Sequence, residues 1–268
     1  MMKLITALDN SLAAQPVLTT ALALGRLLDA EPELIHVRVD GDRTARSTAD
    51  VAGLPLRTAS GPVLDRLLEC GRAEDVVAMV IGARGTPGGR RPLGSTALAV
   101  ATSLQRPIVI VPLNAPPSAA VRRILVPLEG KLPASLVPRA IVALSREANL
   151  EVVVLHVHEE ASLPPFTDQP QHERHEWTRE FLTRYCPWGI GRVRLETRLG
   201  RSEELIPLVA AETRADLIVL GWAQELAEGR APVVRAALSR GRAPVMLVPV
   251  RVPTPKEESW SSLQSLPV

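Results

Sequence analysis

The amino-acid sequence repeats itself, and this repeat constrains the fold more than any other feature. Four segments of the first half match four segments of the second half in composition and order. The matched pairs are LITALD (4–9) with ILVPLE (124–129), LIHV (34–37) with VLHV (154–157), MVIG (79–82) with IVLG (218–221), and RPIVIVP (106–112) with APVMLVP (243–249). Similarity in the same order, at separations of 120 to 139 residues, indicates two copies of one structural unit. The prediction is a first half (1–113), a linker (114–120), a second half (121–250) and a tail (251–268).

Within each half, apolar runs of strand length alternate with amphipathic stretches of helical length. Runs such as EVVVLHV (151–157) and DLIVLG (216–221) are apolar throughout, which is typical of strands buried on both faces of a parallel sheet. The pattern predicts two tandem doubly wound, Rossmann-like α/β domains, each with a five-stranded parallel sheet flanked by helices. The expected strands of the second half are 122–128, 151–158, 192–198, 216–221 and 244–249, and its expected helices are 134–148, 171–186, 202–214 and 233–241.

The two halves differ in the length of one connection. The first half has 24 residues between His36 and Gly61, whereas the second half has 43 between His156 and Gly200. The first half is therefore expected to be a shortened copy, with only a turn or a short helix at this crossover.

Composition and charge exclude several classes of protein. The net charge of +2 is too small for a nucleic-acid-binding surface or a polybasic membrane patch. No apolar run approaches the ~20 residues that a membrane helix needs. Cys70 and Cys186 lie far apart and form no CxxC motif, which favours reduced thiols in a cytoplasmic protein. We expect neither nucleic acid nor a membrane as a partner.

The stretch GARGTPGGRRPLGST (82–96) combines glycines, prolines and three arginines with no acidic residue. It follows a buried strand and precedes a helix. A glycine-rich loop that leads into a helix N-terminus presents backbone N–H groups and a positive dipole end to phosphate oxygens. Ligands of doubly wound sheets bind at the carboxyl ends of the strands, where Asp9 closes the first strand. The candidate nucleotide-binding residues on this basis are Asp9, Gly82, Arg84, Gly85, Arg90, Arg91, Gly94, Ser95 and Thr96.

These residues resemble the universal stress protein family, whose nucleotide-binding members carry a G-x2-G-x9-G-[ST] signature. Gly82, Gly85, Gly94 and Ser95 give G-x2-G-x8-G-S here, with a spacer one residue shorter. The resemblance covers both halves, as a tandem member. It implies a five-stranded parallel sheet and ATP that is held rather than rapidly turned over. It also implies that Asp9 lies beside the adenosine and that Val37, after the histidine of LIHV, lies beside the adenine.

The corresponding loop of the second half, GWAQELAEGRAPVV (221–234), lacks these features, which it has either lost or never had. Gln224 replaces the second glycine, Ala231 and Pro232 replace the Gly-Ser pair, and Glu225 and Glu228 replace arginines. Glu129 stands where the first half has its first-strand aspartate. We therefore expect one nucleotide per chain, in the first half, and we expect Gln224→Ala to leave its affinity unaltered.

Other chemical sites have weaker support. His156 and His158 on a strand and His172 and His175 on a helix match no zinc signature, so we expect no metal site. A G-x-S-x-G elbow and a general base beside the loop are both missing, so we expect no enzyme, although slow ATP hydrolysis stays open as an alternative.

The expected function is a cytoplasmic stress-response protein that binds an adenine nucleotide as a regulatory ligand. The expected ligand is ATP, with or without Mg²⁺ or Mn²⁺, and AMP or a cyclic nucleotide are alternatives. An interaction module with a vestigial loop, or a slow nucleotide hydrolase or nucleotidyl transferase, are the alternative functions.

Assembly follows from the last strand of each half. Isolated, these apolar strands would be exposed sheet edges, which invite pairing. We expect residues 108–111 to lie against 245–248 as an intramolecular pseudo-dimer. An unknown protein partner and a homodimer of tandem chains stay open.

Overall fold

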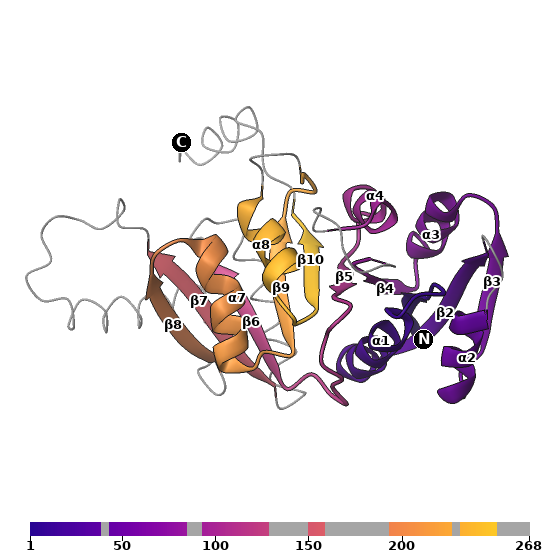
Figure 1. Ribbon diagram of the computed structural model, residues 1–268, viewed down its shortest axis with the longest axis horizontal. Coiled ribbons are helices and arrows are strands. Elements are labelled where there is room, and N and C mark those ends of the chain that lie inside the picture. Colours follow the sequence, from indigo (N-terminus) through magenta and orange to yellow (C-terminus); the bar gives the residue numbers. More distant parts are fainter. Residues whose placement is uncertain (39–42, 85–92, 129–149, 159–192, 227–230, 251–268) are drawn as a thin grey trace, which may run out of the picture.

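The computed structural model describes residues 1–38, 43–84, 93–128, 150–158, 193–226 and 231–250 (Figure 1). Strands and helices alternate along both halves. In chain order the elements are β1 (Met2–Ala7), α1 (Ala14–Leu28), β2 (Ala30–Arg38), α2 (Arg43–Val51), β3 (Leu56–Ser60), α3 (Val63–Gly71), β4 (Val76–Gly82), α4 (Ser95–Ser103), β5 (Ile108–Val111), β6 (Arg123–Leu128), β7 (Glu151–His158), β8 (Val193–Leu199), α7 (Ser202–Thr213), β9 (Leu217–Trp222), α8 (Pro232–Arg240) and β10 (Val245–Pro249).

All ten strands form one sheet in the order β3-β2-β1-β4-β5-β10-β9-β6-β7-β8. Each half contributes five strands that are parallel to one another, and the second half has the strand order of the first half reversed about the centre. The fold class expected from the sequence is confirmed. Every strand expected in the second half lies within one residue of its observed position, as do the last two helices; expected helices 134–148 and 171–186 lie outside the described residues.

The halves join through the antiparallel pair β5 and β10. Ile108, Val109 and Ile110 face Leu247, Met246 and Val245 in register, and all six side chains are buried. The pairing expected between 108–111 and 245–248 is confirmed. Because β5 and β10 cover each other, the edges of the sheet are β3 and β8.

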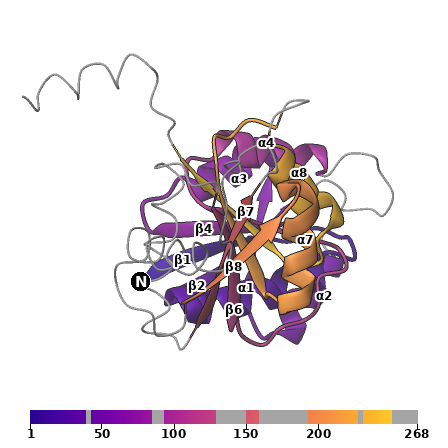
Figure 2. The same cartoon turned by 90° about the vertical axis from the view of Figure 1, so that its left-hand side faces the viewer.

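Alternate residues of each strand face different helical layers. In β4, Ala78 and Val80 belong to a core with α1 and α2, whereas Met79 and Ile81 belong to a core with α3, α4, α7 and α8. Both cores contain residues of both halves. Figure 2 shows the described helices arranged around the strands. This two-faced burial explains why the strands read as unbroken apolar runs.

The short crossover of the first half contains α2, a helix of nine residues. The expected turn or short helix is therefore a short helix. Its polar sequence buries only Ala45, Thr48 and Ala49, which pack beside α1. A short crossover suffices because β2 and β3 are neighbours in the sheet.

The segment between the halves is fixed at both sides by hydrogen bonds. Arg26 Nη1 of α1 donates to the carbonyl oxygen of Ala119 at 2.8 Å. On the other side, the Asp216 carboxylate accepts from the backbone N–H groups of Arg122 and Arg123 at 2.8 and 2.9 Å. These contacts tie the segment to elements of both halves.

Each half carries an ion cluster at the start of its first strand. Lys3 Nζ lies 2.9 Å from Asp75 and 3.3 Å from Glu33, which also pairs with Arg57. In the second half, Arg123 occupies the matching position and pairs with Glu151 at 2.6 Å.

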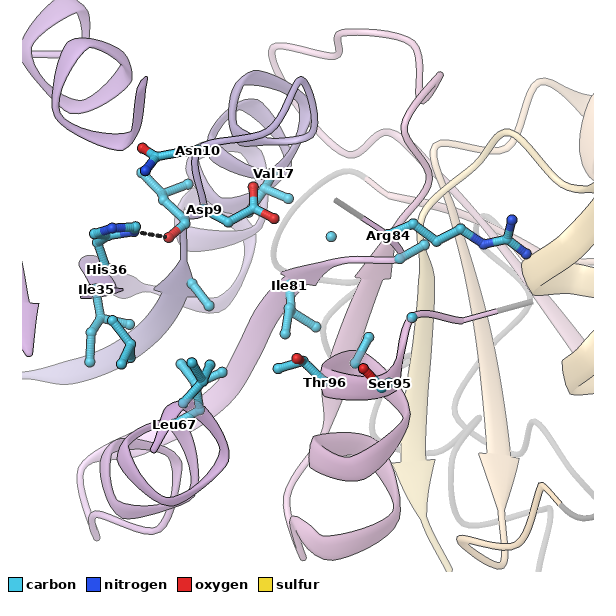
Figure 3. Close-up of a pocket in the computed structure, with 18 residues that line it drawn as sticks. Asp9, Asn10, Val17, Ile35, His36, Leu67, Ile81, Arg84, Ser95 and Thr96 are labelled. Atoms are coloured by element: carbon cyan, nitrogen blue, oxygen red, sulfur yellow. Dashed lines mark hydrogen bonds between the residues drawn. The ribbon is translucent and has the colours of Figure 1, made fainter. Parts of the chain in front are cut away.

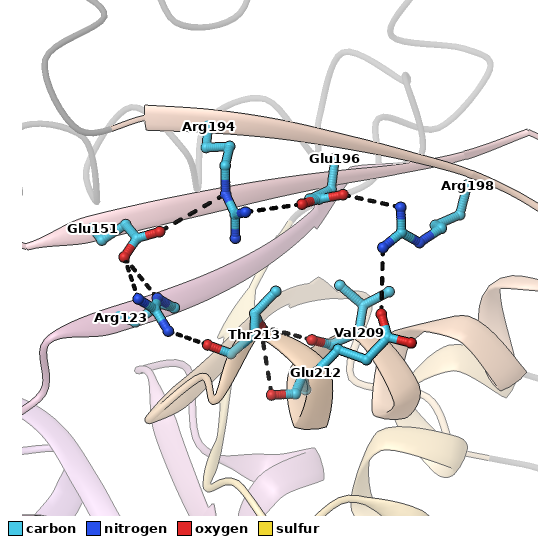
Figure 4. Close-up of polar contacts among 9 residues, drawn as sticks. Arg123, Glu151, Arg194, Glu196, Arg198, Val209, Glu212 and Thr213 are labelled. Atoms are coloured by element: carbon cyan, nitrogen blue, oxygen red, sulfur yellow. Dashed lines mark hydrogen bonds and ion pairs between the residues drawn. The ribbon is translucent and has the colours of Figure 1, made fainter.

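The cluster of the second half continues along the edge strand (Figure 4). Glu151 lies 3.8 Å from Arg194 of β8, and Glu196 lies between Arg194 and Arg198, at 3.1 and 3.0 Å. Arg198 reaches Glu212 of α7 at 3.3 Å. Charged side chains along an edge strand disfavour pairing with a further strand.

The shared cores predict that both halves unfold together. Ile110→Ala removes a fully buried side chain at the joint between β5 and β10. We expect a loss of about 2–5 kcal/mol in the free energy of unfolding, in one transition. Urea unfolding followed by tryptophan fluorescence and by far-UV circular dichroism checks this. Two separated transitions would show that the halves are independent.

The Lys3–Asp75 pair predicts a dependence of stability on pH. The Lys3 ammonium lowers the pKa of Asp75, and Asp75 in turn raises the pKa of Lys3. A lowered carboxyl pKa gives stability that is present above the unfolded value, about 4, and is lost as the pH falls through the folded value. We expect Asp75→Asn to be less stable than wild type at pH 7 and to lose less stability in acid, measured by thermal unfolding from pH 2 to 7. Parallel curves would contradict the assignment.

Candidate functional site

A cavity of about 490 Å³ lies at the carboxyl ends of β1, β2 and β4 in the first half (Figure 3). This is the point where the strand order reverses, because the chain runs from β1 outward to β2 on one side and returns to β4 on the other. Seven of the residues proposed from the sequence line the cavity: Asp9, Val37, Gly82, Arg84, Gly94, Ser95 and Thr96. Gly85, Arg90 and Arg91 lie outside the described residues.

Asp9 is held in a fixed orientation by the turn that follows β1. Its Oδ1 accepts hydrogen bonds from the Ser11 N–H at 3.0 Å and from the Ser11 hydroxyl at 2.5 Å. Ser11 Oγ in turn accepts from the Ala13 N–H at 3.1 Å, just before α1 begins. Among the described residues, Oδ2 of Asp9 has no hydrogen-bond partner. The carboxylate extends from the loop after β1 toward the side of the cavity on which Arg84 lies (Figure 3).

Apolar side chains form the wall of the cavity beneath Asp9. Ile35 and Val37 of β2, Leu67 of α3 and Ile81 of β4 line it. A wall of this kind suits a flat, weakly polar ring system, because its burial gains hydrophobic free energy without leaving polar groups unpaired.

His36 of β2 stabilises the loop that carries Asp9. Its ring is 4% exposed, and Nδ1 lies 2.8 Å from the carbonyl oxygen of Leu8. A carbonyl oxygen only accepts, so Nδ1 carries the proton in this contact. The bond ties β2 to the residue before Asp9. This supporting role was not predicted from the sequence, where the histidine served as a marker of the repeat; its recurrence in LIHV and VLHV was the available signal.

Asn10 is a second supporting residue that the sequence analysis missed. Its side-chain oxygen accepts from the N–H groups of Thr44 and Ala45 at 3.1 and 3.2 Å. It thereby caps the N-terminus of α2 from another part of the chain, as a local N-cap would. The loop that carries Asp9 is thus tied to the short crossover helix. An asparagine directly after a strand-ending aspartate was the only signal in the sequence.

The opposite side of the cavity is the N-terminus of α4. Gly94 is the N-cap and donates from its N–H to the Ala83 carbonyl oxygen at 2.8 Å. The N–H groups of Ser95, Thr96 and Ala97 belong to the first turn, which has no partners within a helix. No acidic residue lies in this turn. The cavity therefore faces a positive helix end that can bind an anion.

Arg84 reaches in a different direction from the one expected. It lines the cavity, but its side chain extends away from Asp9 toward the ribbon of the second half (Figure 3). A phosphate role for its guanidinium requires a different side-chain rotamer.

The matching loop of the second half is built differently. Trp222 stands where the first half has Ala83 and is 3% exposed, and its Nε1 has no hydrogen-bond partner among the described residues. Ala231, in place of Gly94, adopts a left-handed backbone with φ 45°, and Pro232 follows as the first helical residue. Proline has no N–H to offer. Ala231 and Pro232, which the sequence marked as differences, thus give α8 another N-cap conformation than α4 and one N–H donor fewer in its first turn. Glu129 and Glu228 lie outside the described residues.

The described residues contain no group of three or more metal-ligating His, Cys, Asp or Glu side chains. His172 and His175 lie outside them. Among the described helices, none has the length and apolar character needed to cross a membrane.

Two glycines of the site have different physical roles, which a matched pair of variants can separate. A Cβ on Gly82 would lie 3.0 Å from Ala13 Cβ, whereas a Cβ on Gly94 would meet only Ala83 O at 3.5 Å and Arg84 Cα at 3.8 Å. We expect Gly82→Ala to cost about 1–3 kcal/mol through overpacking. Gly94→Ala should cost less than about 1 kcal/mol, the effect of a poorer N-cap. Urea unfolding of both variants measures this, and the reverse order would contradict it.

The second half matches a family model: residues 120–249 match that of the universal stress protein family. No curated protein sequence matches the chain. Solved structures share the fold, among them three that each align with 92% or more of this chain. A protein of unknown function from Pseudomonas aeruginosa PAO1 is 11% identical, with a TM-score of 0.66 over 98% of this chain and 96% of its own. A putative universal stress protein from Pseudomonas aeruginosa UCBPP-PA14 is 12% identical, with the same score and coverage. A universal stress protein from Archaeoglobus fulgidus DSM 4304 is 14% identical, with a TM-score of 0.59 over 92% and 96%. Residues 120–249 are therefore matched as a universal stress protein domain, and the first half repeats the sheet order of this domain.

Proposed function

We propose that the cavity of the first half binds one adenine nucleotide per chain as a regulatory ligand. The observation that carries the proposal is the pairing of two features across one cavity. On one side Asp9 presents a carboxylate oxygen, and on the other α4 presents the N–H groups of its first turn. A nucleotide has matching groups at its two ends, namely ribose hydroxyls that donate hydrogen bonds and phosphates that accept them.

Each part of the cavity then has a role. The base lies against the apolar wall that includes Val37, the ribose hydroxyls donate to Asp9 Oδ2, and a phosphate accepts from the N–H groups and hydroxyls of Ser95 and Thr96. Arg90 and Arg91 of the glycine-rich stretch add positive charge to this end in the proposal. A phosphate gains most where oriented donors replace water without further rearrangement.

In this proposal the protein is a cytoplasmic binding protein and not an enzyme. Among the described residues that line the cavity, Asp9 is the one with a carboxylate, and it lies on the side opposite the helix end that takes the phosphates in this proposal. Hydrolysis needs a base within hydrogen-bond reach of the attacking water. Turnover of ATP by the purified protein would favour the alternative of a slow hydrolase.

The ligand is ATP in this proposal, with or without Mg²⁺ or Mn²⁺. Mass spectrometry of an acid extract of freshly purified protein identifies any nucleotide that is carried along. Calorimetry with ATP, AMP, a cyclic nucleotide and adenosine then ranks the ligands. Absence of binding for all four would leave the interaction-module alternative.

Gly94→Val tests the phosphate end directly. The backbone at Gly94, with φ −66° and ψ 160°, accepts a β-branched residue. Its side chain would occupy the space in front of the first turn of α4. We expect loss of ATP binding with the unfolding midpoint nearly retained, and a wild-type stoichiometry of one.

Asp9→Asn is the matched variant at the other end, because the amide oxygen can still accept from Ser11. We expect it to weaken ATP and adenosine alike, whereas Gly94→Val weakens mainly ATP. A wild-type stoichiometry near two, or a Gly94→Val variant with unaltered affinity, would refute the assignment to the first half.

A further inference from the structure

Gln224 of the second half reaches into the first half and contacts the C-terminal end of α4. Its Nε2 donates to the carbonyl oxygens of Leu104 at 2.8 Å and Ala101 at 3.3 Å. Its Oε1 accepts from Gln105 Nε2 at 2.5 Å. Since carbonyl oxygens only accept and the Gln105 amide nitrogen only donates, this set of partners fixes the orientation of the Gln224 amide.

The contact satisfies groups that the helix itself leaves open. The last carbonyl groups of an α-helix have no partner within the helix. In α4 the Val100 carbonyl oxygen accepts a hydrogen bond from the Leu104 N–H at 2.9 Å. The Ala101 carbonyl oxygen accepts one from Gln224. Ala101 and Leu104 are fully buried, so water does not readily replace this donor.

The backbone of Gln224 is shaped to make the contact. Its φ of 59° is left-handed, a conformation that glycine adopts most readily. By the repeat, Gln224 occupies the position of Gly85 in the first half. The second half therefore has a glycine residue's backbone conformation at a position occupied by glutamine. Both ends of the glutamine amide make hydrogen bonds to the first half.

Helix α4 connects this contact to the candidate site. It is nine residues long, about 13 Å, and its first turn lines the cavity. The contacts of Gln224 and the N–H groups that face the cavity therefore lie at the two ends of one short helix. The expectation from the sequence, that Gln224 has no bearing on binding, does not account for these contacts.

We propose that Gln224 is a positioning residue for the nucleotide phosphates: through α4 it makes phosphate binding in the first half dependent on the second half. This inference rests on the proposed function. It also gives the second half a role in a chain that binds one nucleotide, because any partner that displaces the 221–226 segment would alter affinity in the first half.

The test uses the full chain with two variants of Gln224 and one control. Gln224→Glu keeps an acceptor for Gln105 but places a carboxylate against two carbonyl oxygens. Gln224→Gly removes the side chain. Because glycine adopts a left-handed backbone without strain, we expect this variant to fold. Arg26→Ala is the control, because it removes a hydrogen bond of the same type, to Ala119, that lies outside α4 and the cavity.

Calorimetry is the first measurement. We expect both Gln224 variants to bind ATP about tenfold more weakly, within the usual range for coupled sites, and adenosine within about twofold of wild type. Arg26→Ala should bind both ligands like wild type. Equal losses for ATP and adenosine, or unaltered ATP affinity, would overturn the proposal.

Amide NMR spectra without any nucleotide form the second measurement. The signals of Ser95 and Thr96 should shift in both Gln224 variants and stay in place in Arg26→Ala. If wild type binds no nucleotide, the proposed function is wrong, and the NMR spectra still decide whether Gln224 positions α4. Unshifted Ser95 and Thr96 signals would show that it does not.

Discussion

The antiparallel pairing of β5 with β10 is the interaction on which the rest of the structure depends. Each strand alone would be an apolar edge with unpaired N–H and C=O groups. Their pairing converts two five-stranded sheets into one and runs both apolar cores through both halves. It also brings the loop after β9 next to the C-terminal end of α4. Without this pairing, Gln224 would not lie within hydrogen-bond distance of its partners in the first half.

The sheet order in turn determines where a ligand can bind. Crossovers on opposite sides of β1 separate the loops after β1 and β4, which leaves a cavity at their carboxyl ends. The remaining conditions are local. Gly82 lets β4 pass close to Ala13 at the start of α1, and Gly94 leaves the first turn of α4 open. The two glycines of one sequence signature therefore serve packing and access respectively.

The sequence was sufficient for the fold and for seven of the 18 residues that line the cavity, and the reasons are physical. Apolar runs buried on both faces identify the strands, and two apolar terminal strands of one chain predict their own pairing. Asp9, Gly94 and Ser95 follow from their places at strand and helix ends. Asn10 and Gln224 could not be predicted, because their partners lie 34 and about 120 residues away. Side-chain hydrogen bonds to distant backbone groups leave no periodic pattern in a sequence.

The loop after the fourth strand has different surroundings in the two halves. In the first half the loop after β4 and the start of α4 leave a cavity open beside Asp9. In the second half Trp222 is buried at the matching strand end, Pro232 removes a donor from the helix start, and Gln224 turns toward the other half. Pro232 removes a backbone donor that a phosphate could use, and Gln224 adds contacts to the other half. A loop that does not need to bind a ligand is free to form contacts with the interface beside it. Gln224 places these contacts at the end of the helix whose first turn lines the cavity of the first half.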